Sequence, residues 1–174
     1  MPDFTLKSVE EAAMKAAVSA LNKMAKRLIT VMSRRLREKY DIKKRDLDAN
    51  FSIQKATAKN PIAVLFVYGE RISLSAFNPK KTKIGVQVTI VRGKPVMIKG
   101  VFVGRRKVGS LGSIGSKDVF ERKGKERLPI KSVAGPNIAD LVRSKEITEL
   151  ITTTFNMDYE KLFQSEFKYY SSKV

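Results

Sequence analysis

A helical repeat of apolar residues, extending over residues 9 to 39, constrains the fold more than any other feature of this chain. Ser8 followed three residues later by Glu11 matches a capping box at its N-terminus. An unbroken helix of this length measures about 46 Å, so we expect it to span the domain or to project into a partner. Many apolar positions are alanine, which lets a neighbour approach closely. The stripe consists of Val9, Ala13, Ala16, Ala17, Ala20, Met24, Leu28, Val31 and Met32.

After residue 50 the pattern becomes that of short strands. Alternating or continuous apolar runs bounded by Gly, Pro and Asn predict extended segments. A hairpin turn is expected at residues 92–95, and Gly100 is expected to interrupt the last segment with a bend. We read these segments as an antiparallel meander. They cover residues 51–55, 62–67, 73–77, 84–91 and 96–103.

The rest of the chain completes an α+β prediction. Residues 104–118, rich in Gly, Ser and cations, predict a mobile loop. Apolar periodicity predicts two helical segments, over residues 138–144 and 146–168. We expect a single domain, residues 1–174, in which the helices pack on a mostly antiparallel sheet. Its parts are the long helix (1–40), the β-sheet region (50–131) and the C-terminal helices (137–170).

The charge of the chain limits its function. Lysine and arginine total 35 against 17 acids, which gives a net charge of +18. This surplus cannot be neutralised internally, so the surface should attract nucleic acid, an anionic membrane or an acidic protein face. Simple solubility by charge is the plainer explanation, but it usually needs far less imbalance. We see no signal-peptide pattern, and no apolar run is long enough to span a membrane.

The charge is also unevenly distributed. Residues 23–45 carry ten cations and two acids, and residues 92–107 carry six cations and no acid. Residues 140–168 carry six acids and four cations. A protein with regions of opposite sign can associate with copies of itself.

The sequence provides little for catalysis. It contains no histidine and no cysteine, which removes the commonest proton-transfer, nucleophilic and zinc-binding groups. The stretch GSLGSIGSK, residues 109–117, fails the spacing of a phosphate-binding loop because Ser116 separates its last glycine from Lys117. Asp118 and Glu121 could bind a metal in principle, but cations crowd both sides. We therefore expect no enzymatic activity, no catalytic residue, no metal site and no cofactor.

Sequence-specific nucleic-acid recognition is not indicated either. Aromatic residues are few, and the best aromatic–cation neighbours are Phe102 with Arg105 and Phe120 with Arg122. Each phenylalanine is more simply explained as core. Any contact with DNA should therefore be made to its backbone, through charge.

Several segments, in this order, resemble the prophage minor tail protein Z family of tailed bacteriophages. The first four are Ile42–Leu47, Lys55–Pro61, Leu74–Phe77 and residues 119–131, VFERKGKERLPIK, and Gly135-Pro136 follows. The resemblance covers roughly residues 9 to 140. Its most specific part is the string F-x-R-x-G-K-x-R-L-P-I, matched by Phe120, Arg122, Gly124, Lys125, Arg127, Leu128, Pro129 and Ile130.

The resemblance implies a non-enzymatic virion protein that completes the tail at its head-proximal end, the neck. It implies a ring, expected to be a hexamer, around the DNA path, in contact with tail-tube, terminator and connector proteins. Such a protein is assembled in the host bacterial cytoplasm and has no membrane partner. Cationic side chains facing the channel would attract DNA phosphates. The first candidates are Arg105, Arg106, Lys107 and Lys117; Arg34, Arg35 and Arg37 are the second, and these three could instead dock on an acidic neighbour.

The sequence leaves open both the role of one segment and the function class of the whole chain. The segment from Phe120 to Ile130 can be a turn and an edge strand with Phe120 in the core, or a direct contact with a partner. The whole chain can also be a free, sequence-independent nucleic-acid-binding protein, which would show the same charge and the same lack of catalytic groups. An enzyme acting on phosphates is a third class, for which the chain lacks an obvious carboxylate cluster.

Overall fold

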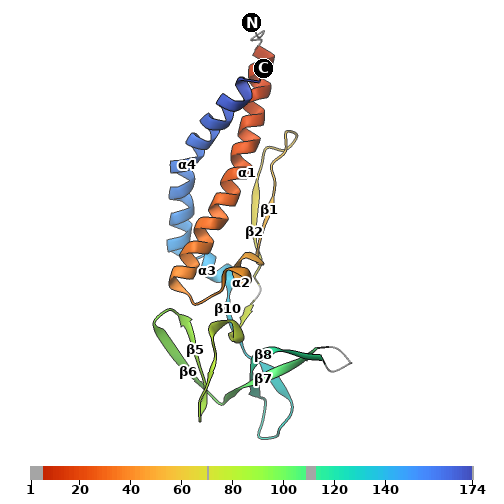
Figure 1. Ribbon diagram of the computed structural model, residues 1–174, viewed down its shortest axis with the longest axis vertical. Helices are drawn as coiled ribbons and strands as arrows, with labels where there is room; N and C mark the ends of the chain where they lie inside the picture. The colour runs from red at the N-terminus through yellow and green to blue at the C-terminus, as the bar shows by residue number, and fades with distance from the viewer. Residues whose placement is uncertain (1–5, 70, 109–112, 174) are drawn as a thin grey trace. The chain divides into compact units, whose positions relative to one another are not determined.

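The computed structural model describes residues 6–69, 71–108 and 113–173, with side chains described outside residues 106–116. Within them the chain is an α+β protein with a long N-terminal helix, C-terminal helices and antiparallel strands, as predicted (Figure 1). The strands form four small sheets instead of one meander. The chain divides into two compact units. The helical unit comprises Met1–Arg34, Phe51–Tyr68 and Val142–Val174, and the β-rich unit comprises Arg35–Asn50 and Gly69–Leu141.

The helical unit is built on α1 (Leu6–Lys39), whose last residues belong to the β-rich unit. Helix α4 (Lys145–Ser171) runs antiparallel to α1, with Arg27 Nη2 lying 2.8 Å from Asp158 Oδ2. Strands β1 (Phe51–Gln54) and β2 (Val64–Val67) form a hairpin on another side of α1 (Figure 1). Asn22 ties the hairpin to the helix, since its side chain donates to the Ala56 carbonyl at 3.0 Å and accepts from the Ala56 amide at 2.8 Å.

The predicted apolar stripe of α1 is buried in part: Ala16, Ala20, Met24 and Met32 are buried, whereas Val9 is 37% exposed, and Ala12, outside the predicted stripe, is buried as well. The small side chains of the buried alanines allow close packing. The predicted capping box is wrong, because α1 already includes Leu6 and Lys7 and Ser8 therefore lies inside the helix. Glu11 Oε2 instead lies 3.9 Å from Lys15 Nζ, one turn further along the helix. Of the helices in the described part of the chain, none has both the length and the apolar character needed to cross a membrane.

A buried carboxylate links α1 to α4. Glu166 is 8% exposed; it accepts hydrogen bonds from Lys23 Nζ and, at 2.6 Å, from Ser19 Oγ. These bonds, the Lys23 bond first, lower the Glu166 pKa below its ordinary value of 4.5, although burial acts in the opposite direction. The two helices are thus joined by a charged contact that requires an ionised carboxylate.

Replacing Glu166 by glutamine is expected to cost about 1 kcal/mol at neutral pH, since an exposed lysine supplies one partner. The lowered pKa means that this contribution is complete above pH 4.5 and is lost as the pH falls through the folded-state value. Urea denaturation of both proteins from pH 7 to about pH 3 should therefore show the difference shrinking in acid. The exposed Glu10→Gln control should stay within about 0.5 kcal/mol of wild type, and a Glu166→Gln difference independent of pH would contradict the account.

Three small sheets form the β-rich unit together with the short helix α2 (Lys44–Asp48) and α3 (Ile138–Val142), the last residue of which belongs to the helical unit. The first pairs β3 (Arg71–Ser73) with β10 (Ala134–Asn137). The second has the order β4 (Lys80–Lys81), β5 (Gly85–Val91) and β6 (Lys94–Lys99). The third has the order β7 (Val101–Val108), β8 (Ser113–Arg122) and β9 (Ile130–Ser132).

The core of the β-rich unit surrounds Phe77, which is completely buried. This residue ends the 3₁₀ helix η1 (Leu74–Phe77). Strand β10 lies directly on its ring, because a Cβ added at Gly135 would be 2.9 Å from Phe77 Cε2. Other fully or almost fully buried side chains of this unit are Leu47, Leu74, Val86, Val88, Val119 and Ile138.

Two local predictions in this unit are wrong. Residues 73–77 were expected to be extended, but Ser73 caps η1 by accepting from the Ser75 amide, which favours a helical turn. The loop expected over 104–118 is largely strand, since β7 and β8 pair through Val103 with Val119 and Gly104 with Asp118. Residues 109–112 lie outside the described part. The turn between β5 and β6 is confirmed, as is the bend at Gly100, where φ is 75°.

Candidate functional site

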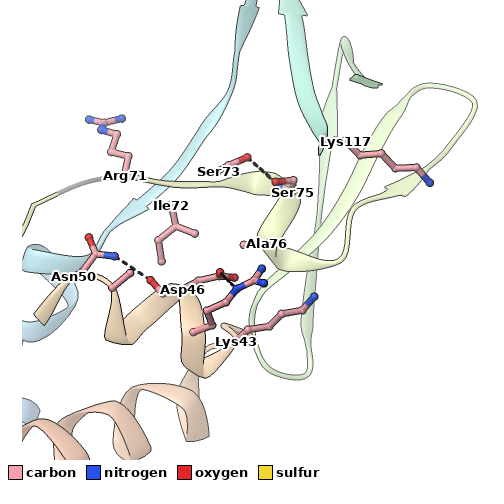
Figure 2. A pocket seen from close by; sticks show the side chains of 11 residues that line it. Lys43, Asp46, Asn50, Arg71, Ile72, Ser73, Ser75, Ala76 and Lys117 are labelled. Atoms are coloured by element: carbon pink, nitrogen blue, oxygen red, sulfur yellow. Dashed lines mark hydrogen bonds and ion pairs between the residues drawn. The ribbon is translucent and has the colours of Figure 1, made fainter. Parts of the chain in front are cut away.

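A cleft of about 520 Å³ lies in the β-rich unit, and cationic residues line it (Figure 2). Its walls are α2 with the flanking residues Lys43, Ala49 and Asn50, strand β3, the 3₁₀ helix η1, and Lys117 of β8. Its charged residues are Lys43, Arg45, Asp46, Arg71 and Lys117. We call it the cationic cleft.

Local structure on the α2 side follows from a short amphipathic turn. Leu47 is completely buried and anchors α2 in the core. The Lys43 carbonyl accepts from the amides of Asp46 and Leu47, which starts the helix. Asn50 Nδ2 donates to the Asp46 carbonyl at 2.9 Å and closes its end. The cations Lys43 and Arg45 are left exposed beside the cleft.

The opposite wall is held by a buried carboxylate. Asp118 is 6% exposed and accepts from Ser73 Oγ, from Ser132 Oγ at 2.7 Å and from the Val119 amide at 2.8 Å. Ser73 Oγ also lies 2.8 Å from Ser75 Oγ. Since Asp118 accepts from three donors on β3, β8 and β9, it holds these strands together at the wall of the cleft. This structural role of Asp118 differs from the role of metal ligand, which the sequence had left possible.

The charges that surround the cleft are unbalanced. Lys43, Arg45, Arg71 and Lys117 are all exposed, and among the described residues that line the cleft Asp46 is the one acidic residue. Asp46 Oδ1 lies 3.5 Å from Arg45 Nε. In Figure 2 Arg71 projects on one side of the cleft and Lys117 on the other. Spread cations with little competing acid suit an extended polyanion better than one small anion.

The same imbalance characterises the whole β-rich unit. Its residues include 22 lysines and arginines against 9 aspartates and glutamates, whereas the helical unit has 13 against 8. The β-rich unit therefore carries +13 of the net charge of +18. Any anionic partner should approach this unit first.

The predicted contact residues are distributed over different places. Lys117 lines the cleft, together with Lys43, Arg45 and Arg71, which had not been proposed as contacts. The Lys43-Lys44-Arg45 run was visible in the sequence as a basic segment, but nothing distinguished Arg71. Arg105 is exposed and lines a second cavity. Arg106 and Lys107 lie on β7, and their side chains are outside the described part.

The second group of predicted contacts lies on α1. Arg34 belongs to the helical unit, whereas Arg35 and Arg37 belong to the β-rich unit. Arg35 Nη1 lies 3.1 Å from Glu38 Oε2 on the same helix. None of these three residues lines the cationic cleft.

The family string forms the second cavity, of about 780 Å³, in the third sheet. Phe120 on β8 is buried, as the turn-and-edge-strand interpretation requires, and β9 is an edge strand. Gly124, Lys125 and Pro129 belong to the connection between β8 and β9, and the Leu128–Pro129 peptide is cis. We call this the motif cavity; it is lined by Phe102, Arg105, Phe120, Arg122, Arg127, Leu128 and Ile130.

Metal coordination finds no support in the side-chain geometry of the described ranges. No group of three or more His, Cys, Asp or Glu residues there could hold a metal ion. Both cavities instead offer positive charge, and the motif cavity adds apolar surface. Such surfaces can bind polyanions or protein segments through charge and packing.

Comparison with known proteins identifies the family. No curated protein and no solved structure matches the chain. The family model described as prophage minor tail protein Z matches residues 4–172, which confirms the resemblance and extends it over the C-terminal helices. The chain belongs to the prophage minor tail protein Z family, and it is a structural protein of a bacteriophage tail.

Proposed function

We propose that this minor tail protein completes the head-proximal end of the tail. Six copies form a ring around the DNA path, in contact with tail-tube, terminator and connector proteins. The ring acts by position and charge and catalyses no reaction. The observation that carries this proposal is the concentration of positive charge on the β-rich unit, +13 of a total of +18.

A position on the DNA path accounts for this charge. Duplex DNA presents about one negative charge per 1.7 Å of its axis and binds cationic surfaces without regard to sequence. The cationic cleft places Lys43, Arg45, Arg71 and Lys117 around one opening, which suits contacts with successive phosphates. A ring lined in this way attracts the genome as it enters the tail.

Deletion of the gene that encodes this protein from the phage genome tests this proposal. We expect particles without the protein to appear as DNA-filled heads and separate tails in negative-stain micrographs, and expression of the chain in trans should restore joined particles. Joined particles that lack only their distal tip structures would contradict the neck position. A protein that is absent from purified wild-type particles would favour the free nucleic-acid-binding alternative.

A further inference from the structure

The motif cavity combines apolar surface with positive charge. Leu128 is 65% exposed and Ile130 is 39% exposed, so the edge of the third sheet presents aliphatic side chains. Three arginines line the same cavity, and no acidic residue of the described ranges does. A matching ligand must therefore be apolar and anionic at once.

The cavity is a built feature of the sheet. Phe102 and Phe120 face each other across β7 and β8 with their ring centroids 6.1 Å apart. The Arg122 guanidinium carbon lies 5.4 Å from the Phe102 ring centroid, where a cation–π contact orients it. The Lys123 amide donates to the Pro129 carbonyl at 3.2 Å and closes the β8–β9 connection. The aromatic floor and the orientation of Arg122 are thus fixed before any partner arrives.

One segment of the chain itself has the complementary character. Residues 149–160 of α4 contain three acids and no lysine or arginine. Glu149, Met157 and Glu160 are exposed, and their spacings of eight and three residues place them on one face of the helix. Met157 is 61% exposed, which leaves a flexible apolar side chain between two carboxylates.

Neither carboxylate is held in a strong contact elsewhere. Lys145 Nζ lies 3.8 Å from Glu149 Oε1 in an exposed pair one turn apart, and such a pair contributes little. Glu160 accepts from Gln164 at 3.1 Å on the surface. Both are available to arginines of a second molecule at small cost.

We propose that the motif cavity of one copy receives the α4 face of a second copy formed by Glu149, Met157 and Glu160. Met157 packs on the aromatic and aliphatic floor, and the two glutamates pair with Arg122 and Arg127. Because the two surfaces are different, the contact is head-to-tail, and repetition of such a contact closes a ring when the rotation permits. This proposal rests on the ring in the proposed function and names its contact.

A charge-swap experiment tests this contact in the full-length chain by sedimentation velocity. Two variants are made, Arg122→Glu with Arg127→Glu and Glu149→Arg with Glu160→Arg. We expect each variant alone to self-associate at least about tenfold more weakly than wild type. A one-to-one mixture should regain assembly, since each reversed surface then meets its complement. The control Lys80→Glu with Lys94→Glu makes the same charge change as the arginine variant, at exposed residues of β4 and β6, and should assemble like wild type.

Several outcomes would overturn the proposal. One is a variant that assembles like wild type, and another is a mixture that stays dissociated although both variants keep wild-type circular dichroism. A wild-type chain that remains monomeric at the highest attainable concentration also overturns it. The neck position is tested separately by the gene-deletion particles, so the contact can fail while the proposed function stands.

Discussion

Binding of duplex DNA is expected to weaken on the order of a thousandfold at about 0.1 M salt when glutamine replaces the four cations of the cleft, Lys43, Arg45, Arg71 and Lys117. Each cation that neutralises a phosphate releases counterions, and the slope of log K against log salt changes by about 0.9 per contact. Loss of four contacts should reduce the slope by about 3.6. Fluorescence anisotropy with a labelled duplex, measured at several salt concentrations, gives both quantities.

A matched variant separates the cleft from overall charge. Glutamine at Lys80, Lys81, Lys94 and Lys99 removes the same net charge from exposed positions outside the cleft. We expect this control to retain most of the affinity and the slope. Equal losses in the two variants would show that the cleft has no special role and that DNA responds only to net charge.

Replacing Phe77 by alanine is expected to destabilise the β-rich unit by about 3 to 5 kcal/mol. The ring is completely buried, and β10 lies on it at Gly135. Structure around a truncated core side chain relaxes only partially, so we expect the variant to leave a cavity. This cost is a large part of the whole stability of a typical domain, about 5 to 15 kcal/mol. Since η1 also forms one wall of the cleft, the variant should lose DNA binding as well.

Native-state hydrogen exchange measures this effect separately in each unit. Amides of β5 and β8 should lose protection, whereas those of α1 before Arg34 should change much less. The Met97→Ala control truncates a side chain that is 40% exposed, and we expect it to cost less than about 1 kcal/mol. Protection in β5 and β8 that is unchanged by Phe77→Ala would contradict this description of the core.

The elements with strong local signals could be predicted from the sequence. The alanine-rich stripe predicts α1 because its apolar residues recur with the period of a helix. The turn between β5 and β6 is predicted by Gly93, which has a positive φ. The β7–β8 hairpin was missed because residues 104–118 have the composition of a loop. Their strand conformation continues the register of the flanking pair Phe102 with Phe120 through the pair Gly104 with Asp118, and strand formation is decided by such tertiary contacts more than by composition.

The candidate site was only partly predictable for the same reason. Lys117 was selected for its basic surroundings, but its neighbours in the cleft, Lys43 and Arg71, are far away in the sequence. Their approach requires β3 and η1 to meet α2 and β8 in the fold. The family string was recognised from resemblance alone. Phe120 lies in the core while Leu128 is exposed. This difference follows the central position of β8 and the edge position of β9 in the sheet, which spacing does not reveal.

Cryo-electron microscopy of the intact phage particle is the sharpest test of the proposed neck position. We expect a ring of this protein at the head-proximal end of the tail, with the cationic cleft of each β-rich unit facing the DNA channel. Copies located at the distal end of the tail, or a ring whose β-rich units face away from the channel, would contradict it.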